Sequence, residues 1–171
     1  MSGTGWVALL RGVNVGGVTI RNTELAEVVA GLGATDVRPV LASGNVVFTL
    51  AGAAASLRGR LEQALQDRFG RPVPVVLVER DRLSALVESF PFPVDADTHA
   101  YVVFASDPAA LAALVAEPVA EPDRVAVGDG VVYWACPRGS STDTPFAKRA
   151  ASSRFRAATT TRNVTTLRRL L

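Results

Sequence analysis

The 171-residue sequence contains only one cysteine and one histidine, so the side chains that most often bind transition metals are scarce. Its single thiol, Cys136, excludes an intramolecular disulfide and is typical of a protein in a reducing compartment. Neither Cys136 nor His99 is accompanied by carboxylates, thiols or imidazoles at the spacing of a metal site. We therefore expect the protein to bind no metal and no cofactor.

Long apolar runs are also missing. No segment of about 18 apolar residues occurs, so no transmembrane helix is expected. The N-terminal residues do not resemble a signal peptide, because no basic residue precedes the short apolar run and Arg11 interrupts it. Together with the single cysteine, these absences predict a cytoplasmic protein.

Recognisable catalytic groupings are absent as well. No base flanks Cys136, so we expect an inert thiol, and His99 is interpreted as a strand residue. The glycines at positions 12, 16 and 17 match neither a Walker loop nor the Gly-x-Gly-x-x-Gly pattern of dinucleotide-binding folds. The sequence indicates no enzyme class and no catalytic residue, and it leaves open whether the protein is an enzyme.

Charge is unevenly distributed along the chain, although the formal net charge is only +2. Residues 137–171 hold eight basic side chains and one acidic side chain, a net charge of +7, whereas residues 1–136 have a net charge of −5. A basic C-terminal third can attract the phosphates of a nucleic acid, or it can dock on the acidic remainder of the same chain. The composition does not decide between these interpretations.

The first 79 residues are predicted to fold as a β-α-β-β-α-β unit. Apolar runs predict its strands, and apolar residues at helical spacing predict its helices. The predicted strands cover 6–10, 37–41, 46–50 and 73–78, with helices between residues 22 and 33 and between residues 57 and 70. Asn22 or Thr23 is expected to cap the first helix. Pro72 and Pro74 predict that the fourth strand lies at an edge of the sheet.

The second half is predicted to repeat much of this order. Strands are expected at 100–105, 124–127 and 131–135, and helices are expected to start at Pro108 and Pro145, the latter running to about Phe155. Threonines before Arg162 favour an extended chain, and Asn163 is expected to cap a last short helix that needs docking to persist. We therefore predict an α+β fold with two ferredoxin-like (split βαβ) subdomains, residues 1–79 and 80–171, with antiparallel sheets and a C-terminal docking helix.

Small polar residues gather at three predicted element ends and form our candidate ligand-binding site. The candidate residues are Arg11, Gly12, Asn14, Gly16, Gly17, Ser43, Asn45, Arg162 and Asn163. The glycines follow the first strand, where backbone N–H groups beside a helix start can bind an anion. Guanidinium groups match the oxygens of phosphate or carboxylate, so the three segments would converge on a small anion. Alternatively, they form an internal network that holds the C-terminal segment on the first subdomain.

The same segments carry a family resemblance. They read LLRGVNVGG at 9–17, SGNVVF at 43–48 and TTRN at 160–163, followed by Thr166. In this order they resemble the uncharacterised bacterial family known as domain of unknown function 1697, over almost the whole chain. The resemblance implies two α+β subdomains and no established biochemical activity. Members of that family usually have Trp-Asn after the Arg-Asn pair, where this chain has Val164 and Thr165, so a role for that aromatic ring is not implied here.

The leading functional hypothesis is a cytosolic module that binds a small anionic or nucleotide-like ligand. Arg11 and Arg162 would neutralise the anion, while Asn14, Asn45 and Asn163 would orient it. A nucleic-acid-binding protein that uses the basic C-terminal third is one alternative, and a protein-interaction module without a ligand is another. No membrane partner is expected, and the sequence does not predict the oligomeric state.

Overall fold

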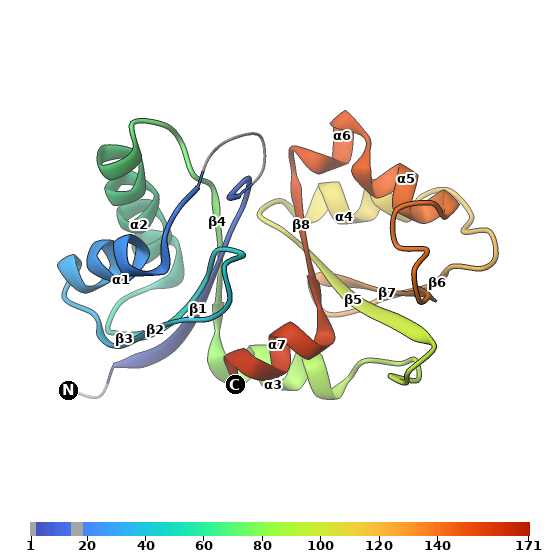
Figure 1. Cartoon of the computed structure of the whole chain (residues 1–171), viewed down its shortest axis with the longest axis horizontal. Coiled ribbons are helices and arrows are strands. Elements are labelled where there is room, and N and C mark those ends of the chain that lie inside the picture. Colours follow the sequence, from blue (N-terminus) through green and yellow to red (C-terminus); the bar gives the residue numbers. More distant parts are fainter. Residues whose placement is uncertain (1–2, 15–18) are drawn as a thin grey trace. The chain divides into compact units, whose positions relative to one another are not determined.

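The computed structural model describes residues 3–14 and 19–171, and the chain forms two compact units. Unit 1 comprises Met1–Ser84 together with Arg169–Leu171, and unit 2 comprises Ala85–Arg168. Each unit contains one four-stranded antiparallel sheet with helices (Figure 1). The predicted α+β fold class with two antiparallel sheets is therefore confirmed.

Unit 1 has the predicted β-α-β-β-α-β order. Its elements are β1 (Thr4–Leu10), α1 (Asn22–Gly31), β2 (Thr35–Pro39), β3 (Asn45–Leu50), α2 (Ala54–Phe69) and β4 (Val75–Glu79). The strands lie in the order β2-β3-β1-β4, with antiparallel neighbours. β4 occupies a sheet edge, as Pro72 and Pro74 predict. Proline has no backbone N–H to donate to a neighbouring strand, so it is tolerated at an edge strand, which has a neighbour on one side only. The register pairs Leu10 with Val75, so the end of β1 lies beside the start of β4.

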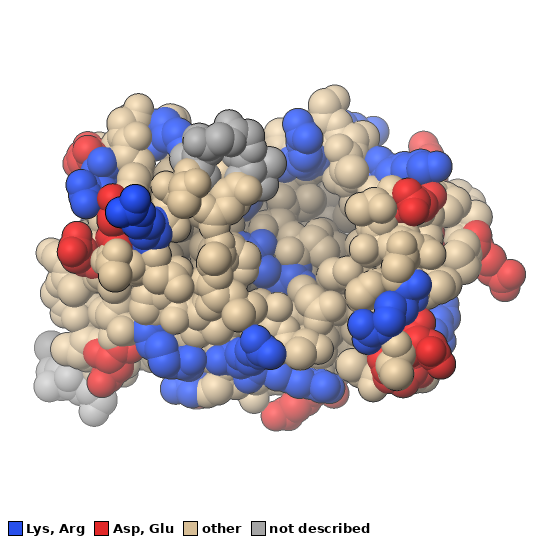
Figure 2. Space-filling model, viewed as in Figure 1, with Lys and Arg blue, Asp and Glu red and all other residues tan. Residues whose placement is uncertain are grey.

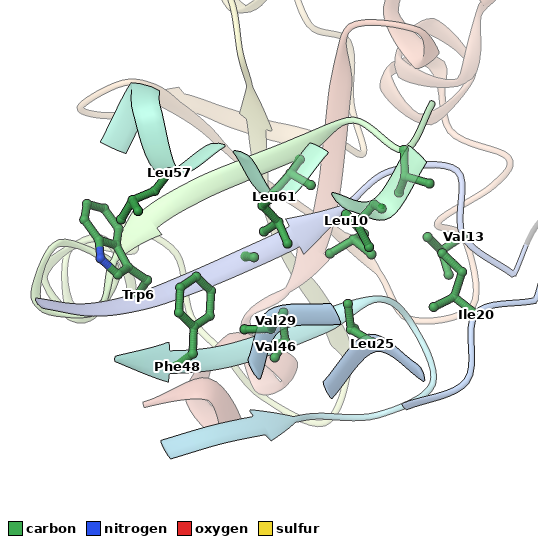
Figure 3. Close-up of a cluster of buried hydrophobic side chains, with 14 residues drawn as sticks. Trp6, Leu10, Val13, Ile20, Leu25, Val29, Val46, Phe48, Leu57 and Leu61 are labelled. Atoms are coloured by element: carbon green, nitrogen blue, oxygen red, sulfur yellow. The ribbon is translucent and has the colours of Figure 1, made fainter. Parts of the chain in front are cut away.

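Helices α1 and α2 cover one face of this sheet with a continuous apolar core (Figure 3). The register of β1 and β3 places Trp6 opposite Phe48 and Ala8 opposite Val46, so these side chains share the helix-covered face. The helices contribute Leu25, Val29, Leu57, Leu61 and Leu65. Burying a large apolar side chain stabilises a fold by about 1.5–3 kcal/mol, so this core fixes where the ends of β1 and β3 lie.

The helix ends of unit 1 show one difference from prediction. α1 begins at Asn22, but Arg21 occupies the cap position, and its N–H donates to the Glu24 carboxylate at 3.3 Å. The predicted cap at Asn22 or Thr23 is therefore wrong. The Glu24 side chain, three residues after Arg21, instead accepts the hydrogen bond from the backbone N–H of the cap residue. α2 ends as predicted at Gly70, whose φ of 71° is the left-handed conformation that favours glycine.

Unit 2 repeats the strand topology of unit 1. Its elements are β5 (Thr98–Ala105), α4 (Pro108–Leu114), β6 (Arg124–Val127), β7 (Val131–Pro137), α5 (Pro145–Ala151), α6 (Ser153–Arg156) and β8 (Thr159–Asn163). The order β6-β7-β5-β8 corresponds strand for strand to the order in unit 1. β8, which contains the three threonines before Arg162, is the fourth strand of this sheet and pairs with β5. Two further helices, α3 (Arg80–Glu88) and α7 (Val164–Leu170), each contribute residues to both units.

The prediction of one helix from Pro145 to Phe155 is wrong. Ser152 has an extended backbone (φ −61°, ψ 152°), so α5 ends at Ala151 and α6 begins at Ser153. The Ser152 carbonyl accepts hydrogen bonds from the N–H groups that follow it, which starts a new helical turn instead of continuing α5. The break accompanies the burial of Phe155 in the core of unit 2.

Candidate functional site

Three loops of unit 1 meet at the end of its sheet where β1 stops. The Arg11 N–H donates to the Pro74 carbonyl at 2.9 Å, which joins the loop after β1 to the loop before β4. The N–H of Leu10, the last residue of β1, donates to the Gly44 carbonyl at 2.8 Å, which joins the end of β1 to the turn between β2 and β3. The first two candidate segments of the sequence therefore lie at one end of one sheet.

Arg11 is half-buried at this end of the sheet. Burial lowers the pKa of its guanidinium group, and the nearby Glu62 carboxylate on α2 opposes this effect by raising the pKa. The Glu62 Oε1 also accepts a hydrogen bond from the Val75 N–H at 2.9 Å. One carboxylate therefore supports both the first residue of β4 and the charged state of Arg11.

Arg71 is a second basic side chain at this end, and it was not among the predicted site residues. Its Nη2 donates to the Gly12 carbonyl at 3.1 Å. Its Nε is buried and has no hydrogen-bond acceptor among the described residues. Gly12 has a φ of 65°, in the left-handed region, so this loop conformation favours glycine. The Arg71 guanidinium group therefore binds the Gly12 carbonyl through Nη2, while its Nε has no acceptor among the described residues.

Asn14 connects the loop after β1 to two neighbouring segments. Its Nδ2 donates to the Ala42 carbonyl, and its Oδ1 accepts from the Ile20 N–H at 3.3 Å. Its φ of 58° is left-handed, a conformation that asparagine tolerates better than most residues. The side chain therefore organises the loop backbone. Gly16 and Gly17, which complete this predicted segment, lie outside the described residues.

The predicted hairpin turn between β2 and β3 is confirmed and is closed by Asn45. The buried Asn45 side chain donates from Nδ2 to the Val40 carbonyl at 3.1 Å and to the Ser43 Oγ at 2.7 Å. Between them, Gly44 has a φ of 72°, and a Cβ atom there would lie 3.0 Å from the Leu10 Cβ. The turn therefore requires glycine both for its backbone conformation and for its close packing on β1.

The third candidate segment belongs to unit 2. Arg162 lies on β8 opposite Val102, and its Nη1 donates to the Thr160 Oγ1 at 2.7 Å and to the Thr161 carbonyl at 3.1 Å. Burial lowers the pKa of this guanidinium group to about 10. Asn163 acts as predicted, because its Oδ1 accepts from the Thr165 N–H at 2.8 Å and caps α7.

The structure gathers one part of the predicted site within unit 1 and another within unit 2. Arg11, Gly12, Asn14, Ser43 and Asn45 share one end of the sheet of unit 1. Arg162 and Asn163 are consecutive residues of unit 2. The convergence of the two groups stays a prediction.

Comparison with known proteins connects this geometry to a family. Residues 4–133 match the family described as "Protein of unknown function (DUF1697)". The chain belongs to this family. The solved structure of the conserved bacterial protein SP0830 from Streptococcus pneumoniae is similar, with a TM-score of 0.81 and 23% identity over 98% of this chain and 96% of that chain. At this identity the likeness shows the fold, and among curated proteins none matches the sequence.

Arg71 was not predicted as a site residue of this DUF1697 member, although the predicted strand order could have identified it. A split βαβ order places the fourth strand beside the first, antiparallel to it. The residues just before β4 must then lie beside the residues just after β1, which are Arg11 and Gly12. A basic residue directly after the helix-ending Gly70 was therefore predictable as a neighbour of Arg11.

Other titratable residues of this DUF1697 protein do not extend the site. Burial raises the pKa of the Cys136 thiol, with a smaller contribution from the Asp123 carboxylate, which fits the predicted inert thiol. Within residues 3–14 and 19–171, His, Cys, Asp and Glu side chains form no group of three or more that could hold a metal ion. No described helix combines the length and the apolar character needed to cross a membrane.

Proposed function

We propose that unit 1 binds a small anion, such as a phosphate or carboxylate group, at the end of β1. The observation that carries this proposal is the buried Nε of Arg71, which has no acceptor among the described residues. A buried donor without an acceptor costs about 1–3 kcal/mol, and native structures leave few such donors unsatisfied. An anion oxygen would supply the missing acceptor.

Arg11 would contribute the second positive charge of this anion site. Its guanidinium group is partly desolvated, which lowers its pKa, and charge interactions strengthen where water is excluded. Guanidinium groups bind phosphate and carboxylate oxygens bidentately, so Arg11 and Arg71 suit the same ligand class. Asn14 and Asn45 would act by holding the loops in place. Direct ligand contact by the remaining candidate residues stays a prediction.

Thermal unfolding in the presence of inorganic phosphate, citrate or AMP tests this proposal. An anion at about ten times its Kd should stabilise unit 1 by about 1.4 kcal/mol and raise its Tm by about 5 °C. Arg71→Gln should abolish most of that shift in Tm, because it removes both the positive charge and the guanidinium donors that bind an anion bidentately. Arg71→Lys should give an intermediate shift, because it keeps the charge and loses the bidentate geometry.

Arg60→Gln is the matched control for this experiment. Arg60 is exposed on α2 and donates to the Leu32 carbonyl at 3.0 Å, at the end of α1. The variant carries the same charge change in the same unit and should retain the full shift. An equal anion-induced shift in Arg71→Gln and wild type would contradict the proposal. Loss of folding in Arg11→Ala would favour the internal-network alternative.

A further inference from the structure

Glu62 is an acidic side chain held at the same end of the unit 1 sheet as Arg11. The peptide group between Pro74 and Val75 connects the two residues. Its carbonyl accepts from the Arg11 N–H at 2.9 Å, and its N–H donates to the Glu62 Oε1 at 2.9 Å. Glu62 is half-buried on α2, so this bond keeps its carboxylate at the start of β4. A negative charge is therefore built into the end of the sheet where Arg11 and Arg71 supply positive charge.

The other acidic side chains of α1 and α2 interact with side chains of the same two helices. Glu24 and Glu27 form ion pairs with Arg68 at 3.3 and 3.8 Å. Asp67 is exposed and accepts a hydrogen bond from a glutamine of α2 at 2.8 Å. In Figure 2, acidic and basic side chains intermingle over the part of the surface where Figure 1 places α1 and α2. Glu62 differs because its carboxylate is bound to backbone at the end of the sheet, so its charge acts on an anion bound there.

Arg71 supplies positive charge that no internal carboxylate neutralises. Its Nη2 donates to the Gly12 carbonyl at 3.1 Å, and within the described residues it forms no ion pair. Arg11 differs in this respect. Burial lowers the pKa of Arg11 and the negative charge of the Glu62 carboxylate raises it, so these two side chains interact. Two guanidinium groups and one carboxylate give the three side chains together a net charge of +1.

We propose that the anion bound at this site carries a single negative charge, and that Glu62 sets this preference. The proposal rests on the proposed function of unit 1 and specifies its ligand class, which is an acidic group with one charge shared by two oxygens, as in a carboxylate or a phosphodiester. Two such oxygens suit the guanidinium donors of Arg71.

A phosphate monoester fits the site less well, because its second pKa of about 6 gives it nearly two negative charges at neutral pH. Glu62 repels such a dianion about twice as strongly as a monoanion. The cost of removing an ion from water also rises with the square of its charge, whereas its attraction to the site rises only in proportion to the charge. Three side chains with a small net positive charge therefore favour the monoanion.

Dimethyl phosphate and methyl phosphate are matched probes for this preference, because at about pH 8 they differ mainly in carrying one and two charges. Nuclear magnetic resonance titrations that follow the amide signals of Gly12, Arg71 and Val75 give a Kd for each probe. Wild type should bind dimethyl phosphate at least as tightly as methyl phosphate. Acetate is the third probe, and the tighter of acetate and dimethyl phosphate identifies the acidic group.

Glu62→Gln should lower the Kd of dimethyl phosphate about threefold and that of methyl phosphate about tenfold, because the lost repulsion acts on one charge in the first probe and on two in the second. The variant keeps a side-chain oxygen as the acceptor for the Val75 N–H, so the start of β4 should stay in place. The matched control is Asp67→Asn, which makes the same charge change at an exposed position of the same helix. It should leave the ratio of the two Kd values within about 1.5-fold of wild type, since exposed charges are screened by water and salt.

Two results would overturn the proposal and leave the proposed function intact. The first is tighter binding of methyl phosphate than of dimethyl phosphate by wild type, a comparison that needs no variant to fold. The second is an unchanged ratio of the two Kd values in Glu62→Gln. A wild-type protein whose signals respond to none of the three probes would contradict the proposed function and this proposal together.

Discussion

At the scale of single residues, the buried carboxylate of Asp123 organises the loops of unit 2. The residue is 6% exposed, its Oδ1 accepts from the Trp134 Nε1 at 2.8 Å, and its Oδ2 accepts from the Phe146 N–H at 2.9 Å. Phe146 lies in the first turn of α5, where N–H groups lack helical partners and a negative charge is favoured. Asp123 therefore joins the core of the sheet to the start of a helix.

Asp123→Ala should lower the free energy of unfolding by about 2–4 kcal/mol, because two buried donors lose their acceptors. Asp123→Asn keeps one side-chain oxygen and should lose about half as much. Urea denaturation followed by circular dichroism measures both values. Asp97→Ala, at an exposed position, should stay within about 0.5 kcal/mol of wild type. An Asp123→Ala protein as stable as wild type would mean that the two donors find other acceptors.

Residue roles were predictable where the partner lies close in the sequence. Asn163 was expected to cap α7, and its partner Thr165 is two residues away. The partners of Asp123 are 11 and 23 residues away, and the partner of Arg71 is 59 residues away. Local propensity does not encode such pairs, because they form only after the strands have found their order.

At the scale of elements, α4 illustrates how a short helix is held at both ends. The Asp107 Oδ1 accepts from the Ala109 N–H at 2.9 Å at its start. After its end, Arg149 donates from Nη1 to the Leu114 and Glu117 carbonyls at 3.2 and 3.0 Å, and from Nη2 to the Pro118 carbonyl at 2.8 Å. A helix of seven residues is marginal alone, so these contacts help to keep it formed.

Arg149→Lys should weaken this arrangement, because an ammonium group cannot reach three carbonyls with the geometry of a guanidinium fork. We expect the variant to lower the free energy of unfolding by about 1–2 kcal/mol. We also expect it to speed amide hydrogen exchange more in α4 than in β7. The neighbouring Lys148 is exposed on the same helix, so Lys148→Gln changes charge without changing the contacts at α4. Unchanged exchange of α4 in Arg149→Lys would show that apolar packing alone holds this helix.

The existence of most elements was predictable, whereas some of their ends were not. Apolar spacing predicted α1 and α2 because buried positions recur with the helical period. The same spacing cannot reveal the break at Ser152, because one extended residue between two helical turns hardly changes the apolar pattern. It also cannot reveal that β8 pairs with β5, because threonines favour an extended chain without choosing a neighbour.

At the scale of the whole molecule, both units have one strand topology, and the last residues of the chain belong to the first unit. The sequence predicted a C-terminal docking helix from its short apolar pattern. The structure assigns Arg169–Leu171 to unit 1 and provides a hydrogen bond from Arg38 to the Arg169 carbonyl. These two residues are 131 positions apart, so the bond was not predictable from local pattern.

Leu170 should therefore contribute to the stability of unit 1 although it lies next to the end of the sequence. The side chain is fully buried, and replacing a buried leucine by alanine removes apolar contacts and leaves a cavity. We expect Leu170→Ala to lower the free energy of unfolding by about 2–4 kcal/mol and to speed hydrogen exchange in β2 and β3. Leu171→Ala, at a half-buried position, is the matched control and should cost less than about 1 kcal/mol. Unchanged exchange of β2 and β3 in Leu170→Ala would mean that the C-terminal residues follow unit 1 without stabilising its sheet.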